Sequence, residues 1–413
     1  MERSFIERYA DVLLSAVNIQ PGQNLLVRAE PVHLAFAGII AERAYARGAR
    51  YVRFDNNEIE NPLMYKARIL HSAPEHLEYV PQFRKDSLET MIDEDWALIA
   101  VRTPEDPDFL ASLDQGRNAT AARAIATAMR PYQSRISNNE ITWLVAFYPT
   151  EKLAGRIMGM SPGQDAVDAL WQVLIPILRL DHADPAAFWV EHGDVLAARA
   201  DKLNSLRLDT LHFSGPGTDL SIGLMEGSIW HGGPDRTTSG RRFSPNIPTE
   251  EVFTSPDYRR TQGRVAFTCP VFVPTVGKII ENGWLRFEGG KVVEYGASAG
   301  KDVLDVYLGM DAGASFLGEV ALVDSSSPIF ASKRTFYNIL FDENAACHIA
   351  LGSAYPGCMK GGSTMNEAEL KTAGANTSAV HTDFMIGSPQ VQVTGLSRDG
   401  RSIPLIDQGL FTI

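Results

Sequence analysis

Helical and strand-like stretches alternate through the first 150 residues, and few architectures accept that order. The segment FIERYADVLLSAV (5–17) repeats apolar side chains at helical spacing, and NLLVRA (24–29) is a short apolar run typical of a buried strand. HLAFAGIIAERAYARGA (33–49) again indicates a helix, and YVRFDN (51–56) indicates a strand. A strand, a helix and a second strand in this order form a β-α-β unit, which predicts a parallel sheet covered by helices.

The same pattern continues to about residue 150 and then changes. DWALIAVR (95–102) and ITWLVAFYP (141–149) are two further strand candidates, and two long helices follow them. Beyond about residue 206, short strands alternate with glycine-rich turns, as in the hairpin WLRFEGGKVVEYG (284–296) with its central Gly289-Gly290.

A chain of 413 residues is longer than one ordinary core accommodates, so two domains are expected. We predict a mixed α/β protein. Its N-terminal α/β domain (1–205) has a largely parallel sheet and long helices at its end. Its C-terminal domain (206–413) is a β-rich α+β domain that binds metal.

The two long helices carry start signals. Ser161, Pro162 and Gln164 fit the N-cap, N1 and N3 positions of a capping box, and Asp184-Pro185 opens the second helix in the same manner. GMSPG (159–163) also matches the G-x-S-x-G pattern of a nucleophilic serine. Pro162 has no backbone N–H to donate to an oxyanion, so we interpret Ser161 as a helix cap.

Composition excludes several classes of partner. A net charge of −12 without any basic block disfavours nucleic acid. The N-terminus has no apolar signal-peptide core, and no apolar run is long enough to span a bilayer. Cys269, Cys347 and Cys358 form no C-x-x-C pair, which favours a reducing compartment. We therefore expect a cytoplasmic protein with no membrane partner.

The segment VHTDFMIG (380–387) places a histidine and an aspartate two residues apart. In a strand, His381 and Asp383 project from the same face about 7 Å apart. An imidazole and a carboxylate on one face suit a divalent cation, although an ordinary surface pair would have the same spacing.

Other acids stand in apolar surroundings of the same domain. PTEEV contains Glu250 and Glu251, which face opposite sides if the segment is a strand. Glu319 is expected where a helix ends and a strand begins, and Glu343 and His348 are expected in a short Ala-rich helix. Burying such an acid costs several kcal/mol unless it is paired or bound to metal.

About four carboxylates and two histidines exceed the ligands of one ion. They suit two divalent ions with a bridging carboxylate, and the absence of thiolates favours a catalytic site over a structural one. The alternative is a set of unrelated caps and salt bridges, in which Asp342 is simply the N-cap of its helix.

At these residues the sequence resembles the M29 metallo-aminopeptidases, the aminopeptidase T or thermophilic aminopeptidase group. The resemblance covers the whole chain, more weakly before residue 200, with small insertions before LGEV and near residues 356–376. The segments that carry it, in the family's order, are GPGTDL (215–220), NIPTEEVFTSPD (246–257), LGEVALV (317–323), FDENAACHIALGSAY (341–355) and VHTDFMIG (380–387).

The resemblance implies a homodimeric hydrolase that removes single N-terminal residues from short peptides with a free N-terminus. It implies two divalent metal ions per chain, which zinc, cobalt, manganese or magnesium would satisfy. The implied ligands are Glu251, Glu319, Glu343, His348, His381 and Asp383. Glu250 is the alternative ligand or the general base, and Tyr355 is the candidate donor to the developing oxyanion. We expect no role for His231 of IWHGG in the substrate pocket.

Two other functions fit part of the pattern. Dihydroxypyridine ring-cleaving dioxygenases resemble relatives of this fold, and a mononuclear non-haem iron site needs only two histidines and one carboxylate. Such an enzyme has no need of Glu251, Glu319 and Glu343 together. A non-enzymatic, metal-stabilised or peptide-binding protein is the third alternative, and it predicts a closed site without turnover.

Overall fold

A computed structural model describes residues 2–56, 62–273 and 276–413, which form two compact units. The first unit comprises residues 1–191 and 234–248, and the second comprises residues 192–233 and 249–413. Helix α8 (Pro185–Leu206) is divided between them along the chain. The predicted boundary between the two domains, at residues 205/206, remains a prediction.

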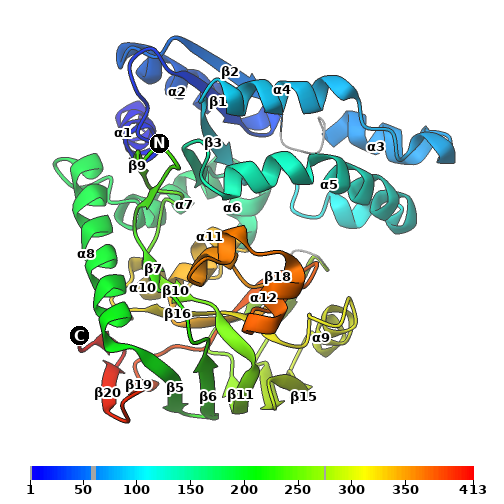
Figure 1. The fold of residues 1–413 in the computed structure, drawn as a ribbon. Helices are drawn as coiled ribbons and strands as arrows, with labels where there is room; N and C mark the ends of the chain where they lie inside the picture. Colours follow the sequence, from blue (N-terminus) through cyan, green and yellow to red (C-terminus); the bar gives the residue numbers. More distant parts are fainter. Residues whose placement is uncertain (1, 57–61, 274–275) are drawn as a thin grey trace. The chain divides into compact units, whose positions relative to one another are not determined.

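A four-stranded parallel sheet in the order β2-β1-β3-β4 organises the first unit. Its strands are β1 (Asn24–Arg28), β2 (Tyr51–Asp55), β3 (Ala97–Val101) and β4 (Trp143–Ala146). Every residue of β1 and β3 is buried, as continuous apolar runs predict. The parallel sheet confirms the expected β-α-β architecture (Figure 1).

Helices cover this sheet, and on one face Leu26 and Leu98 of the strands share a core with Tyr65, Met91 and Ile125 of the helices. The helices and short 3-10 turns of the first unit are α1 (Arg3–Ala16), η1 (Pro31–His33), α2 (Leu34–Ala46), α3 (Pro62–His71), η2 (Pro74–His76), α4 (Gln82–Asp93), η3 (Leu110–Ser112), α5 (Gln115–Ser137), α6 (Glu151–Met158) and α7 (Gln164–Ile177). A two-stranded ribbon, β8 (Asp235–Arg236) with β9 (Arg242–Phe243), completes the unit. Across the described part of the chain, no helix combines the length and apolar character needed to cross a bilayer.

One of the two predicted helix starts is wrong. Helix α7 begins only at Gln164, and its N-cap is Gly163, so Ser161 and Pro162 lie before the helix and form no capping box. Gly163 has φ 154° and contributes no side-chain cap, so the turn geometry at this glycine sets the start. The second start is confirmed, because Asp184 Oδ1 accepts a hydrogen bond of 3.0 Å from the amide of Ala187 in α8.

The second unit contains an antiparallel eight-stranded sheet in the order β15-β14-β11-β6-β5-β19-β20-β21. The hairpin between β14 and β15 is confirmed, with positive φ at Gly289 and Gly290. The strands are β5 (Leu208–Gly215), β6 (Thr218–Leu224), β11 (Pro256–Ala266), β14 (Trp284–Glu288), β15 (Lys291–Gly296), β19 (Gln392–Ser397), β20 (Ser402–Asp407) and β21 (Leu410–Phe411).

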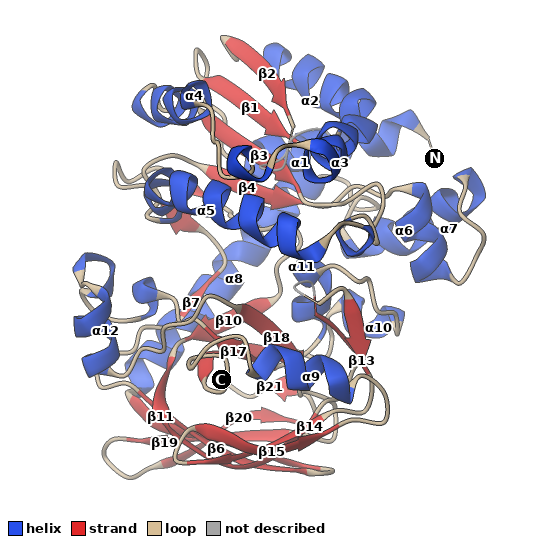
Figure 2. Ribbon diagram, turned by 90° about the vertical axis from the view of Figure 1, so that its right-hand side faces the viewer, coloured by secondary structure: helices blue, strands red, loops and turns tan. Residues whose placement is uncertain are grey.

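A five-stranded antiparallel sheet in the order β18-β17-β16-β10-β7 lies over the eight-stranded sheet (Figures 1 and 2). Its strands are β7 (His231–Gly232), β10 (Glu251–Thr254), β16 (Leu317–Val323), β17 (His348–Gly352) and β18 (His381–Met385). The other elements of this unit are β12 (Val271–Val273), β13 (Lys278–Ile280), α9 (Lys301–Leu308), α10 (Pro328–Ser332), α11 (Ile339–Asp342), η4 (Glu343–Ala345), η5 (Pro356–Cys358), η6 (Gly362–Thr364) and α12 (Glu367–Ala373).

The two faces of the five-stranded sheet differ in chemistry. Val252, Val320, Ile349 and Phe384 belong to the same buried core as the apolar side chains of the eight-stranded sheet. Neighbouring positions along each strand point the other way, because side chains alternate in a strand. That opposite face carries the acids and histidines described next. The combination of a parallel sheet and antiparallel sheets confirms the predicted mixed α/β fold class.

Candidate metal centre

Strand register gathers five of the predicted ligands on one face of the five-stranded sheet. Glu251 begins β10, Glu319 lies in β16, His348 begins β17, and His381 and Asp383 belong to β18. Directly paired antiparallel residues share a face, and the pairs include Ala321 with His348, Ala350 with Asp383, and Gly352 with His381.

Two of the predicted settings are wrong even though the residues come together. Glu319 is the third residue of β16, and the preceding helix α9 already ends at Leu308. His348 is the first residue of β17 and does not lie in a short helix. Alanines at 345 and 346 suggested helix, but pairing with β16 and β18 overrides that local preference.

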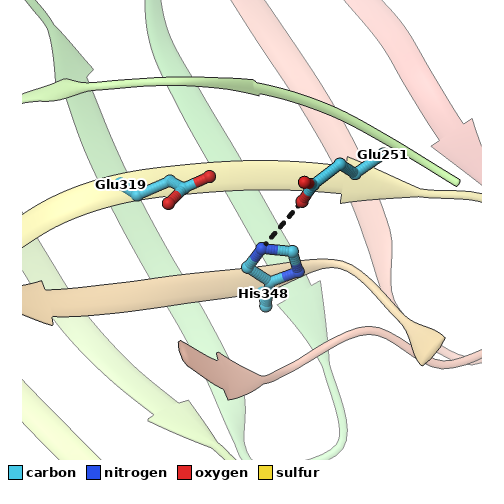
Figure 3. Close-up of side chains that lie close together, drawn as sticks. All are labelled: Glu251, Glu319 and His348. Carbon is cyan, nitrogen blue, oxygen red and sulfur yellow. Dashed lines mark ion pairs between the residues drawn. The ribbon is translucent and has the colours of Figure 1, made fainter. Parts of the chain in front are cut away.

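The side chains form two groups that share Glu319. One group consists of Glu251, Glu319 and His348, and the other of Glu319, His381 and Asp383; the ligand atoms of each lie within 4.8 Å of one another. His348 Nε2 is 3.2 Å from Glu251 Oε2, and His381 Nε2 is 3.1 Å from Glu319 Oε2 and 3.5 Å from Asp383 Oδ1. Figure 3 shows the first group, with the two carboxylates projecting from neighbouring strands and the imidazole beside Glu251.

Both histidines are oriented by backbone carbonyls. The Nδ1 of His381 lies 2.7 Å from Ser353 O, and the Nδ1 of His348 lies 3.2 Å from Ala346 O. A carbonyl oxygen only accepts, so each Nδ1 carries a proton and donates it. In the neutral tautomer each Nε2 therefore presents a lone pair toward carboxylates, which is the usual arrangement of metal-binding histidines.

Glu251 carries a buried carboxylate oxygen whose hydrogen bonding is incomplete. Its Oε2 is within ion-pair distance of His348 Nε2, at 3.2 Å, but makes no hydrogen bond to any described residue. Buried carboxylate oxygens are normally satisfied, and leaving one unsatisfied costs about 1–3 kcal/mol or more. Together with two inward imidazole lone pairs, this oxygen fits a divalent cation.

The charges in the cluster perturb one another strongly. Burial, with further repulsion from Asp383 and Glu251, raises the pKa of Glu319 to about 7, although His381 acts in the opposite direction. Burial alone would lower the pKa of His348, yet the carboxylates around it, Glu251 foremost, raise it to about 10. Bound cations relieve such repulsion, and perturbed titrations of this kind are common at functional sites.

Glu343 lies beside the cluster on η4 but belongs to neither ligand group. Burial and the charges of Glu251 and Asp383 raise the pKa of its carboxyl well above the usual value. Asn344 is fully buried next to it; its Nδ2 donates to Leu340 O at 2.9 Å and lies 3.4 Å from Glu343 Oε1. Asn344 therefore helps to position Glu343.

Asp342 differs from its expected role. It precedes η4, but its carboxylate forms no cap there; instead it accepts from the amides of Phe336 at 2.7 Å and Asn338 at 3.2 Å. The chain folds back before α11, so the amides that need an acceptor come earlier in the sequence. Burial raises the pKa of Asp342 to about 7, and the backbone donors counteract only part of this effect.

Glu250 and Glu251 take different partners, as strand alternation requires. Glu250 Oε2 forms an ion pair of 3.0 Å with His192 Nε2 on α8, and its amide donates to Asn344 Oδ1 at 2.6 Å. Sequence reasoning missed both partners. His192 is 58 positions from Glu250 and stands in an ordinary amphipathic helix, so no local signal marks it.

Tyr355 follows β17 and reaches the cluster. Its hydroxyl lies 3.4 Å from His381 Nε2, while 45% of the residue remains exposed. Ser255 Oγ holds its backbone, accepting from the Tyr355 amide at 3.0 Å. A phenol in this position is open to a ligand and adjacent to the proposed metal ligands.

A mixed α/β chain with a buried cluster of carboxylates and inward-facing imidazoles has the side chains of a metal-dependent enzyme. The sequence model of one such family, described as "Thermophilic metalloprotease (M29)", matches residues 3–411. The chain belongs to this family and is therefore a peptide hydrolase.

Individual relatives match over nearly the full length. Aminopeptidase 2 of Geobacillus stearothermophilus is 38% identical over 405 residues, 98% of this chain and 97% of that protein. Aminopeptidase T of Thermus aquaticus is 38% identical over 399 residues, 96% of this chain and 95% of that protein. Among solved structures, wild-type AmpT from Thermus thermophilus has a TM-score of 0.90 at 33% identity and covers 100% of this chain and 99% of its own. The dioxygenase alternative finds no support in these comparisons.

Proposed function

We propose that this peptidase is an aminopeptidase that removes single residues from the free N-terminus of short peptides and uses two divalent ions. The names of the relatives support exopeptidase action at the N-terminus. The observation that carries the two-ion proposal is the pair of ligand groups that share Glu319. A carboxylate common to two adjacent groups is the usual bridge in two-metal sites.

Charge balance supports the same number of ions. Glu251, Glu319, Glu343 and Asp383 interact electrostatically within one buried cluster. Four carboxylates cannot all ionise in a buried site without compensation, and two divalent cations would neutralise them. We propose Glu251, Glu319, Glu343, His348, His381 and Asp383 as the ligands. Oxygen and imidazole donors suit zinc, cobalt, manganese or magnesium.

Metal ions in such a site polarise a peptide carbonyl and lower the pKa of water. The protein's own groups supply the remaining steps. Tyr355 would donate its hydroxyl proton in a hydrogen bond to the developing oxyanion of the scissile carbonyl. Glu250 would accept a proton; it lies outside both ligand groups, and its Oε2 faces His192 Nε2 at 3.0 Å.

The direct test measures metal content and activity on one preparation. We expect two ions per chain by elemental analysis, together with release of the first residue from aminoacyl p-nitroanilides and short peptides. Peptides with an acetylated N-terminus should remain intact, because the free amine is needed for binding. A fully metallated protein that holds one ion per chain would overturn the two-ion proposal, and internal cleavage of acetylated peptides would overturn the aminopeptidase proposal.

The homodimer implied by the family resemblance and the cytoplasmic location expected from the sequence remain predictions. Light scattering of the purified protein at micromolar concentration tests the first: a mass near twice 45.3 kDa supports a dimer, and a mass near 45.3 kDa contradicts it.

A further inference from the structure

A row of aromatic and imidazole rings runs from the metal centre to the edge of the five-stranded sheet. The ring centroid of Tyr355 lies 5.0 Å from that of His381 and 5.8 Å from that of Phe253. Phe253 in turn lies 6.0 Å from His231 on the edge strand β7. The row therefore begins at a proposed metal ligand and continues without interruption to the end of the sheet.

Phe253 lies on the face of the sheet that carries the cluster. It is two residues from Glu251 in β10, and side chains two apart in a strand share a face at about 7 Å. It pairs directly with Ala321 on one side and with His231 on the other. Ala321 presents only a methyl group there, so the phenyl ring is not covered by a large neighbour from β16.

The row is held in place and remains partly open. The Nε2 of His231 donates to Gly357 O at 2.9 Å, and Ser255 Oγ accepts from the amide of Tyr355 at 3.0 Å. Phe253 and His231 are half-buried, and Tyr355 is 45% exposed. A phenyl ring that is fixed by its neighbours but still touches solvent offers an apolar contact to a ligand at little cost in ordering.

We propose that Phe253, flanked by Tyr355 and His231, forms the wall that receives the side chain of the substrate's N-terminal residue. This inference rests on the proposed aminopeptidase function and names the substrate class of that site: peptides whose first side chain is large and apolar. Phe253 lies about one strand repeat, ~7 Å, from Glu251, so its ring is adjacent to a peptide whose amine and first carbonyl are held at the cluster. This proposal places His231 at the substrate pocket, where the sequence alone led us to expect no role for it.

The test compares Phe253→Ala with the wild-type enzyme on leucyl, phenylalanyl and alanyl p-nitroanilides, which share one leaving group. We expect kcat/KM for the leucyl and phenylalanyl substrates to fall about 10–100-fold, and kcat/KM for the alanyl substrate to change less than about threefold. Phe253→Leu should retain most of the preference for leucine, because it keeps an apolar surface. Phe411→Leu, which alters a half-buried ring of the same unit stacked under Arg199, serves as the control and should preserve the wild-type profile.

Two measurements separate this inference from the proposed function and from simple misfolding. Thermal unfolding and metal content of Phe253→Ala should match the wild type, and competitive inhibition by leucinol should weaken in the same variant without any turnover. An equal loss on all three substrates would overturn the inference while leaving the aminopeptidase proposal intact. The inference would also be overturned if the loss of kcat/KM depended on the second residue of dipeptide substrates such as Leu-X and not on the first. Failure of the wild-type enzyme to release any N-terminal residue would instead reject the proposed function.

Discussion

The side chains of Glu251 and His348 approach to 3.2 Å, yet Glu251 Oε2 forms no hydrogen bond to any residue that the structure describes. His348 already donates its Nδ1 proton to Ala346 O, so its Nε2 faces the carboxylate as a second electron-pair donor in the neutral tautomer. A bound cation that accepts an electron pair from each group would account for this arrangement, as proposed above.

The two adjacent glutamates should therefore respond differently to substitution. Glu251→Gln removes a proposed ligand charge, and we expect one ion fewer per chain and a loss of activity of at least about 10³-fold. Glu250→Gln should keep full metal content and lose about 10²–10⁴-fold in kcat, as expected for a general base. Elemental analysis and steady-state kinetics check both. Normal metal content in Glu251→Gln would contradict its assignment as a ligand.

Tyr355→Phe removes only the hydroxyl that lies 3.4 Å from His381 Nε2. We expect kcat to fall about 10²–10³-fold, because one donor to the oxyanion is lost, while KM and metal content stay close to wild type. The ring is retained, so its contact with Phe253 is not changed. Full activity in this variant would show that the hydroxyl does not act in the reaction.

The stability of the metal-free protein should depend on pH. The pKa values of Glu319 and Asp342 are raised to about 7, so both groups hold protons more tightly in the folded chain than in the unfolded chain. Their contribution to folding is complete below about pH 4 and is lost as the pH rises through about 7. The metal-free protein should thus have a lower Tm at pH 8 than at pH 5.

Cations compete with the proton on Glu319, so metal binding should release protons and strengthen by up to about tenfold per pH unit for each proton released. Calorimetric titration in buffers of different ionisation enthalpy measures the number released. Affinity that is constant from pH 5 to pH 8 would contradict this linkage. The stabilisation of Tm by added metal should likewise be larger at pH 8 than at pH 5.

Asn344→Leu removes a buried amide that accepts from the Glu250 amide at 2.6 Å and donates to Leu340 O at 2.9 Å. Leaving these backbone groups without partners should reduce the free energy of unfolding by about 1–3 kcal/mol. Asn344 contacts both Glu250, the proposed base, and Glu343, a proposed ligand. Its loss should therefore also lower metal affinity about 10–100-fold. Denaturant unfolding and metal titration check the two effects. Asn344→Ser, which keeps an acceptor for the Glu250 amide, should lose less of both.

The sequence reveals the site where the relevant pattern is local. His381 and Asp383 are two apart, and the period of a strand is enough to place them on one face. The same argument separates Glu250 from Glu251. It fails for Glu319, expected at a junction between a helix and a strand, and for His348, expected in a helix, because both strands are defined by pairing with segments distant in the chain.

Contacts made entirely at long range leave no trace in the sequence. His192 and Asn344 meet Glu250 across 58 and 94 positions, and neither belongs to a recognisable motif. The parallel sheet of the first unit is different, since continuous apolar runs separated by amphipathic helices permit little else. The early start assigned to α7 arose because the Ser-Pro-x-Gln pattern matched a cap, while the backbone at Gly163 determined where the helix begins.

Glu319 belongs to both ligand groups, so in the proposed two-ion centre the two halves would not bind metal independently. An ion bound by one group changes the Glu319 carboxylate that the other group needs, and so changes the affinity of the second ion. By thermodynamic linkage, the second ion changes the affinity of the first by the same factor. A titration with metal should therefore deviate from the curve of two independent sites. Substitution of Glu319 should weaken both ions and not only one of them.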